Sequence, residues 1–138
     1  MKFPHPKILF LDIETRPALA YVWRLHDENV GLEQLLEPSN ILSVGWKWGG
    51  SSKFHYADVW PVRHAGARRG MLSLAHAALS SADAVVTFNG ARFDLPKLTG
   101  EFLVAGFEPV PPVAHIDVYK ATRQMGFTSN KLAHVPPL

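Results

Sequence analysis

The stretch Lys7-Ile8-Leu9-Phe10-Leu11-Asp12-Ile13-Glu14-Thr15 sets an apolar run directly against two carboxylates one residue apart. Five of the six residues from Ile8 to Ile13 are large and apolar, which predicts a strand buried on both faces of a sheet. Residues i and i+2 of a strand project to the same side, so Asp12 and Glu14 should face each other at its end. Such close carboxylates ionise together only around a cation, and their oxygens suit Mg²⁺ or Mn²⁺. The alternative is a strand that simply enters a polar loop.

The composition predicts one globular domain over residues 1–138. Apolar residues make up 47% of the chain and charged residues 19%, which excludes a disordered protein. The chain has no cysteine, which excludes disulfides, thiolate zinc sites and cysteine nucleophiles and favours a cytoplasmic protein. No apolar run has the length of a membrane span, so no membrane partner is expected. The net charge of +2 permits nucleic-acid binding but is too small to argue for it.

The hydrophobic pattern downstream of the first strand predicts an α/β chain. Further strands are expected at 41–48, 53–60, 84–88 and 113–117, and helices at 31–37, 70–80, 95–106, 119–125 and 129–135. A Gly-Gly-Ser-Ser turn separates strands 41–48 and 53–60, so the two should form a hairpin and, with the first strand, a three-stranded antiparallel meander. The later strands and helices should form a βαβ unit.

Two segments outside these elements carry candidate substrate contacts. Tyr21, Trp23 and Arg24 follow the carboxylates in an irregular segment and could stack on bases or hold a phosphate. The equal alternative is that the two aromatic rings pack a loop over the sheet. Residues 61–70 should form a basic loop that is either solvated or touches phosphate, with Arg63, His64, Arg68 and Arg69.

A second motif, Asn89-Gly90-Ala91-Arg92-Phe93-Asp94, places a third carboxylate at the start of a predicted helix. The strand before it could lie beside the first strand, which would bring Asp94 toward Asp12. Asp94 is also expected to cap this helix, because an aspartate at that position accepts free N–H groups of the first turn. The two roles are compatible. Three carboxylates at the ends of adjacent elements indicate metal-assisted phosphoryl chemistry.

In order, spacing and strand context, these motifs resemble those of the DEDD 3′–5′ exonucleases of the ribonuclease H-like superfamily. Residues 12–15 resemble the first motif of that family and residues 89–94 the second. Residues 116–119 and 129–132 are similar to stretches that follow in bacterial and phage members. The resemblance implies a ribonuclease H-like α/β fold with a mixed central sheet and helices on both faces. It also implies hydrolysis of DNA or RNA from the 3′ end, in replication or repair.

The resemblance further implies the roles of individual residues. Asp12, Glu14 and Asp94 would be catalytic and would hold two Mg²⁺ or Mn²⁺ ions. Phe93 would pack so as to aim Asp94. The implied substrate-binding residues are Thr15 at the 3′-terminal nucleotide, Asn89 near the substrate end, Arg92 and Phe93, in addition to Tyr21 and Trp23.

One departure from the family leaves two functions open. Members carry a third motif, a His or Tyr followed closely by a fourth Asp, on a helix beyond the stretch that residues 129–132 resemble. Asp117 lies too early to be that acid, and neither His115 nor His134 has an Asp four or five residues later. We therefore expect a truncated relative or a fragment with weak hydrolysis, or a non-catalytic relative that binds nucleic-acid ends or a replication partner. A missing helix would leave one sheet face open for a protein partner or a homodimer.

Overall fold

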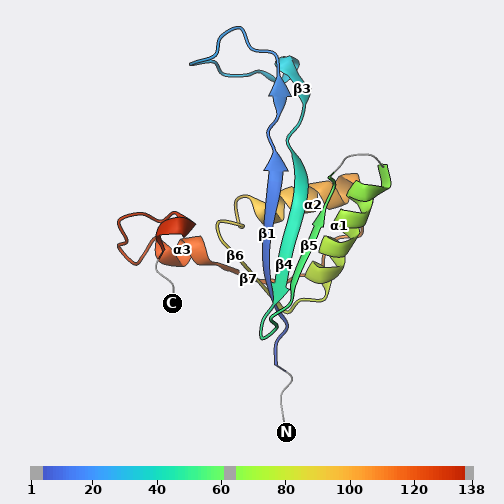
Figure 1. Cartoon of the computed structure of the whole chain (residues 1–138), viewed down its shortest axis with the longest axis vertical. Helices are drawn as coiled ribbons and strands as arrows, with labels where there is room; N and C mark the ends of the chain where they lie inside the picture. The colour runs from blue at the N-terminus through green and yellow to red at the C-terminus, as the bar shows by residue number, and fades with distance from the viewer. Residues whose placement is uncertain (1–4, 61–64, 136–138) are drawn as a thin grey trace.

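A five-stranded mixed sheet forms the centre of the computed structural model, which describes residues 5–60 and 65–135 (Figure 1). The strand order is β5-β4-β1-β6-β7. The five strands are β1 (Ile8–Arg16), β4 (Asn40–Trp48), β5 (Phe54–Asp58), β6 (Ala84–Thr87) and β7 (Ala114–Asp117). Strand β1 pairs antiparallel with β4 and parallel with β6, so the predicted meander and βαβ unit meet along β1. The predicted α/β fold class is confirmed.

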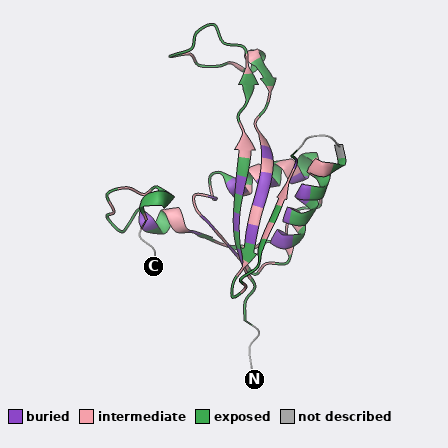
Figure 2. Cartoon of the chain, in the orientation of Figure 1, coloured by how far each residue is buried: buried purple, intermediate pink, exposed green. Residues whose placement is uncertain are grey.

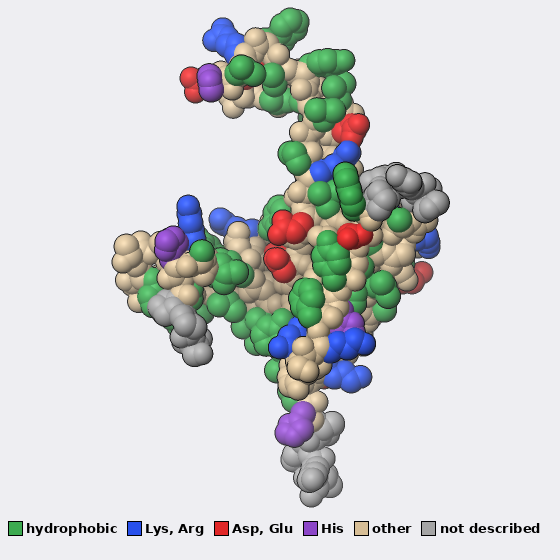
Figure 3. Space-filling model, viewed as in Figure 1, with side chains coloured by type: hydrophobic (Ala, Val, Ile, Leu, Met, Phe, Trp, Pro, Cys, Tyr) green, Lys and Arg blue, Asp and Glu red, His purple; other side chains and the backbone are tan. Residues whose placement is uncertain are grey.

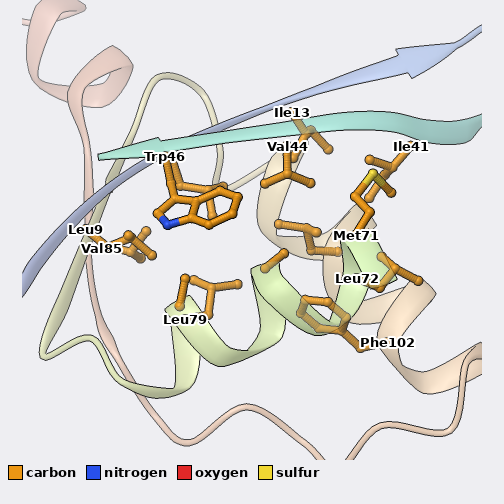
Figure 4. Close-up of a cluster of buried hydrophobic side chains, with 14 of the residues drawn as sticks. Leu9, Ile13, Ile41, Val44, Trp46, Met71, Leu72, Leu79, Val85 and Phe102 are labelled. Carbon is orange, nitrogen blue, oxygen red and sulfur yellow. The ribbon is translucent and has the colours of Figure 1, made fainter. Parts of the chain in front are cut away.

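Two helices, α1 (Ala65–Ser80) and α2 (Asp94–Val104), cover one face of this sheet. Their apolar side chains meet those of β1, β4 and β6 in a single core (Figure 4). Leu9, Met71, Leu72, Val85 and Leu98 are almost completely buried there. Each such side chain contributes roughly 1.5 to 3 kcal/mol through burial. The core therefore determines which face of β1 carries the acidic residues.

Strand β1 differs from the prediction in its burial and its length. Leu9, Leu11 and Ile13 point into the core, whereas Phe10, Asp12 and Glu14 alternate with them and are exposed. The strand is therefore half exposed and not buried on both faces, and it continues to Arg16, so the carboxylates lie within it and not at its end. The hydrophobic pattern gave the wrong prediction of burial on both faces because Phe10 is as apolar as its buried neighbours.

The opposite face of the sheet is only partly covered. Aromatic side chains are exposed there, with Phe10 on β1 and Phe54 and Tyr56 on β5 at 47%, 64% and 59% accessibility. Helix α3 (Val118–Thr122) and the short turn η2 (Leu132–His134) lie at the β6 side of the sheet, and side chains from both line a hollow of about 470 Å³ over β1 and β4. The helix predicted over 119–125 is thus shorter, and helical structure in 129–135 is one 3₁₀ turn.

An arm projects beyond the end of the sheet (Figure 1). Strands β2 (Leu19–Ala20) and β3 (Leu35–Glu37) pair in it, and the predicted helix over 31–37 is reduced to the 3₁₀ turn η1 (Leu32–Gln34). Most of the arm is exposed (Figure 2), and Trp23 is 92% accessible. The aromatic rings of Tyr21 and Trp23 are therefore exposed on the arm and are not packed over the sheet.

The predicted basic loop is mostly helix, since α1 already begins at Ala65. Arg68 pairs with Glu101 of α2, and the Arg69 guanidinium donates to the carbonyl oxygen of Ala105. These two arginines join α1 to α2 and are not free for phosphate. Arg63 and His64 lie outside the described residues.

No helix in the described part of the chain has the length and apolar character that crossing a bilayer requires.

Candidate active site

The Asp94 carboxylate is fixed against the middle of β1. Its Oδ1 accepts a hydrogen bond from the Ile13 backbone N–H at 3.0 Å, and the side chain is only 3% exposed. This N–H is free because the parallel pairing of β1 with β6 runs only from Ile8 to Phe10. The bond joins residues 81 positions apart in the chain and places Asp94 beside the peptide that links Asp12 to Ile13.

Asp94 does not cap helix α2, contrary to the prediction. It is the first residue of the helix, and the N-cap residue is Phe93, whose side chain makes no capping hydrogen bond. The carboxylate turns instead toward β1, because the Ile13 N–H would otherwise remain unpaired in a buried position. Asp94 therefore links α2 to the strand that carries Asp12 and Glu14.

The electrostatic setting of Asp94 lacks a counter-charge. Burial and, to a lesser degree, the nearby negative charge of Asp12 raise its pKa to about 6, against the opposing effect of the Ile13 N–H bond. Among the residues that the structure describes, no lysine or arginine forms an ion pair with Asp12, Glu14 or Asp94. Two neighbouring carboxylates without a cation are a setting in which a bound metal ion would be favoured.

The donor set fits a hard cation in its chemistry. Asp12, Glu14 and Asp94 offer only carboxylate oxygens, which Mg²⁺ and Mn²⁺ prefer. Within residues 5–60 and 65–135, however, no three acidic, histidine or cysteine side chains gather closely enough to hold an ion. Asp12 and Glu14 extend from an exposed strand face, whereas Asp94 is buried beside it. Their joint role as metal ligands remains a prediction.

A second aspartate, Asp117, holds the loop that leads to Asp94. Its carboxylate accepts backbone N–H bonds from Asn89 at 2.8 Å, from Ala91 at 3.1 Å and from Tyr119 at 3.1 Å. Burial raises its pKa, but these N–H bonds outweigh that effect, so the pKa of Asp117 lies below its ordinary value. Asn89 adopts φ 63°, which asparagine tolerates better than most residues. The sequence motif therefore serves in part to shape this loop.

Thr87 supports the same loop from the end of β6. Its buried hydroxyl accepts the Gly90 N–H at 3.1 Å and lies 2.8 Å from Nε2 of His115. Burial lowers the pKa of His115, so its imidazole favours the neutral form. His134 lies exposed on η2. The structure thus gives His115 a role in the loop.

The predicted substrate contacts fall into separate parts of the molecule. Thr15 is half-buried near the end of β1, and Phe93 is half-exposed beside Asp94. Asn89 and Arg92 line a pocket next to Asp117. Tyr21 and Trp23 lie on the arm, beyond the end of the five-stranded sheet (Figure 1). Sequence reasoning missed Thr87 and the loop-holding role of Asp117, for which a polar residue at or next to the end of each predicted strand was the available signal.

Replacing Asp94 by asparagine should stabilise the metal-free chain at neutral and alkaline pH. The folded pKa of about 6 exceeds the ordinary 3.8, so the folded chain binds the extra proton more tightly. The stability that comes from neutral Asp94 is present below the ordinary pKa and is lost as the pH rises through the folded value. Asparagine imitates the neutral form, so Asp94→Asn should gain about 1 to 3 kcal/mol at about pH 8 and little at low pH. Urea unfolding at a series of pH values would measure this, and an equal difference at every pH would contradict it.

Comparisons with known proteins extend these observations. A family model described as RNase_H superfamily matches residues 27–137. Among solved structures, a family B DNA polymerase from the hyperthermophilic archaeon Pyrobaculum calidifontis superposes with a TM-score of 0.59 and 15% sequence identity. The likeness covers 93% of this chain and 17% of that polymerase, and at this identity it concerns the fold alone. A comparison with curated proteins gives no match.

Proposed function

Because the chain belongs to the RNase H superfamily, we propose that it is a metal-dependent 3′–5′ exonuclease domain that hydrolyses phosphodiester bonds of DNA or RNA. The observation that carries the proposal is the 3.0 Å bond from the Ile13 N–H to Asp94. It brings the acidic residue of the second motif to the strand that carries Asp12 and Glu14. Asp12 then lies close enough to Asp94 for its negative charge to raise the pKa of Asp94.

In this proposal Asp12, Glu14 and Asp94 hold Mg²⁺ or Mn²⁺, with two ions expected. Bound metal would supply a water of lowered pKa and stabilise charge on the phosphate and the leaving oxygen. Asp94 is positioned for its part by Ile13 and by the start of α2. Asp117 and Thr87 hold the preceding loop. In this proposal the loop presents Asn89 and Phe93 to the 3′ end of the nucleic acid. Thr15 lies on the same strand as Asp12 and would contact the terminal nucleotide.

The finer assignment follows the motif resemblance. Residues 12–15 and 89–94 support membership of the DEDD branch, of the kind found in bacteria and phages. We propose that the protein acts in DNA replication or repair, in the cytoplasm. Tyr21 and Trp23 are proposed to stack on bases from the exposed arm.

The direct test is metal-dependent shortening of a labelled single strand. A 5′-labelled oligonucleotide should yield a ladder of shorter products with Mg²⁺ or Mn²⁺, and none with a chelator. Blocking the 3′ end should stop the reaction, because the proposed enzyme removes nucleotides from that end. Internal cuts in a circular strand would point instead to an endonuclease of the same superfamily, and no cleavage of any substrate would contradict the proposal.

A non-catalytic relative is the second candidate function. It is favoured by the lack of a three-residue ligand group in the described part of the chain and by the exposed aromatic residues on the open sheet face. Such a protein would bind nucleic-acid ends or a protein partner, or form a homodimer through that face, without turnover. Strand binding without cleavage, at saturating metal, would identify this case.

A further inference from the structure

A hollow of about 520 Å³ lies between the loop that carries the second motif and helix α3. Arg92 enters it from the loop, and Lys120 and Arg123 enter it from α3 and the residue that ends this helix. Lys120 and Arg123 are three positions apart, a spacing that places side chains on the same side of a helical turn. Two segments about thirty residues apart thus direct their basic side chains into one concave surface.

Within the part of the chain that the structure describes, these three basic side chains have no internal partner. The ion pairs of the described residues are Arg16–Glu37 and Arg68–Glu101, and no side-chain hydrogen bond is found there for Arg92, Lys120 or Arg123. By contrast, Arg68 and Arg69 are engaged with α2. The basic residues of the hollow are therefore available to an external anion, whereas those between α1 and α2 are structural.

The one acidic residue that lines the hollow, Asp117, is already engaged. Both of its carboxylate oxygens accept backbone N–H bonds, from Asn89, Ala91 and Tyr119. Its charge thereby orders the loop, and three positive charges face this single negative one. The formal charge of the lining is +2, from three basic residues less one acid. Figure 3 shows Lys and Arg side chains on the α3 side of the acidic side chains at the centre of the view, and others below them.

The chemistry of the lining suits a phosphate group. Guanidinium groups bind phosphate oxygens through two parallel N–H bonds, and a lysine ammonium adds a mobile charge. The same wall presents the Tyr119 ring, which Phe88 holds edge-on at 5.6 Å between ring centroids. An aromatic ring next to free cations is suited to a nucleotide, because a base can lie near the ring while its phosphate meets the charges.

The loop that lines the hollow also leads to the candidate active site. Asn89 and Arg92 line the hollow, and Asp94, two residues after Arg92, is bonded to β1. We propose that Arg92, Lys120 and Arg123 form a phosphate-binding pocket for the backbone of the nucleic-acid strand whose end lies at Asp12 and Asp94. This assignment rests on the proposed function, since it takes that strand as the ligand.

The test compares two double variants of the full chain in binding to a fluorescent single strand with a chelator present, so that hydrolysis plays no part. Lys120→Gln/Arg123→Gln removes two charges from the pocket. Lys7→Gln/Lys53→Gln removes two exposed charges at the opposite end of β1 and serves as the matched control. We expect the pocket variant to bind roughly tenfold more weakly. Its salt dependence should be shallower by about 0.7 for each phosphate that the variant no longer neutralises. The control should stay within about twofold.

Equal weakening by both variants would show a general charge effect and would contradict the proposed phosphate-binding pocket. Unchanged binding by Lys120→Gln/Arg123→Gln would contradict it as well. A nucleoside 5′-monophosphate that competes with the strand, where the nucleoside alone does not, would confirm that phosphate is the recognised group. Failure of the proposed function is distinguishable: the strand would then bind in the pocket-dependent way described, but added metal would cause no shortening. Thermal unfolding should show both variants folded, because all four side chains are exposed.

Discussion

Asp12→Asn is expected to lower metal-dependent hydrolysis at least about 100-fold, because a metal ion supplies several kcal/mol of transition-state stabilisation. Asparagine keeps the shape of the side chain but removes the negative charge. The side chain of Asp12 is exposed on β1, so the fold should persist. Rates of strand shortening at saturating Mg²⁺ would measure the loss. The stabilisation of the folded chain by added metal, about 1 to 3 kcal/mol when metal greatly exceeds its Kd, should disappear with it.

The matched control for this substitution is Asp27→Asn. Asp27 lies on the arm with a backbone φ of 56°, a conformation that asparagine adopts readily, so the same atoms change far from the candidate site. This control should retain both activity and metal stabilisation. If Asp12→Asn hydrolyses the strand as fast as Asp27→Asn does, the carboxylate of Asp12 has no part in the chemistry.

The fold was largely predictable because its signals are local. Strands β4, β5, β6 and β7 each overlap a strand that the hydrophobic pattern predicts, and the order of the elements indicated how β1 and β6 pair. Burial was less predictable. Whether Phe10 lies inside or outside depends on which face of the sheet is covered, and that is a property of the packed chain. The arm escaped prediction because β2 and β3 are two and three residues long, too short to show a period.

The candidate site shows the same division between local and distant information. The spacing of Asp12 and Glu14 was visible in the sequence, as was the position of Asp94 at a helix start. The turn of Asp94 away from its own helix was not visible, because it depends on a free N–H 81 positions earlier in the chain. Lys120 and Arg123 gave no signal either, since single exposed charges on or next to a short helix are common on any protein surface. Only the folded chain brings them to the loop of Arg92.

Gly90→Ala is expected to destabilise the chain by about 2 to 4 kcal/mol, because the loop that leads to Asp94 has no room for a methyl group. A Cβ at this position would lie 2.2 Å from the Thr87 hydroxyl and 2.5 Å from its Cβ. Thr87 cannot easily move, since it is 4% exposed and its hydroxyl contacts both the Gly90 N–H and His115. Relief of the clash would break the Gly90 bond. Urea unfolding would measure the loss.

Gly100→Ala provides the control within the next element. Gly100 lies inside α2 with nothing within 4 Å of its added Cβ, so alanine should stabilise the chain by about 0.5 to 1 kcal/mol. The two substitutions add the same methyl group ten positions apart, and we expect opposite signs because only one of them meets a packed neighbour. At temperatures where Gly90→Ala stays folded, it should also hydrolyse the nucleic acid more slowly than the original chain. Unfolding cannot explain that loss, and we expect it because the displaced loop carries Asp94. A neutral or stabilising Gly90→Ala would mean that the loop can shift freely, and Thr87 would then not be what positions the second motif.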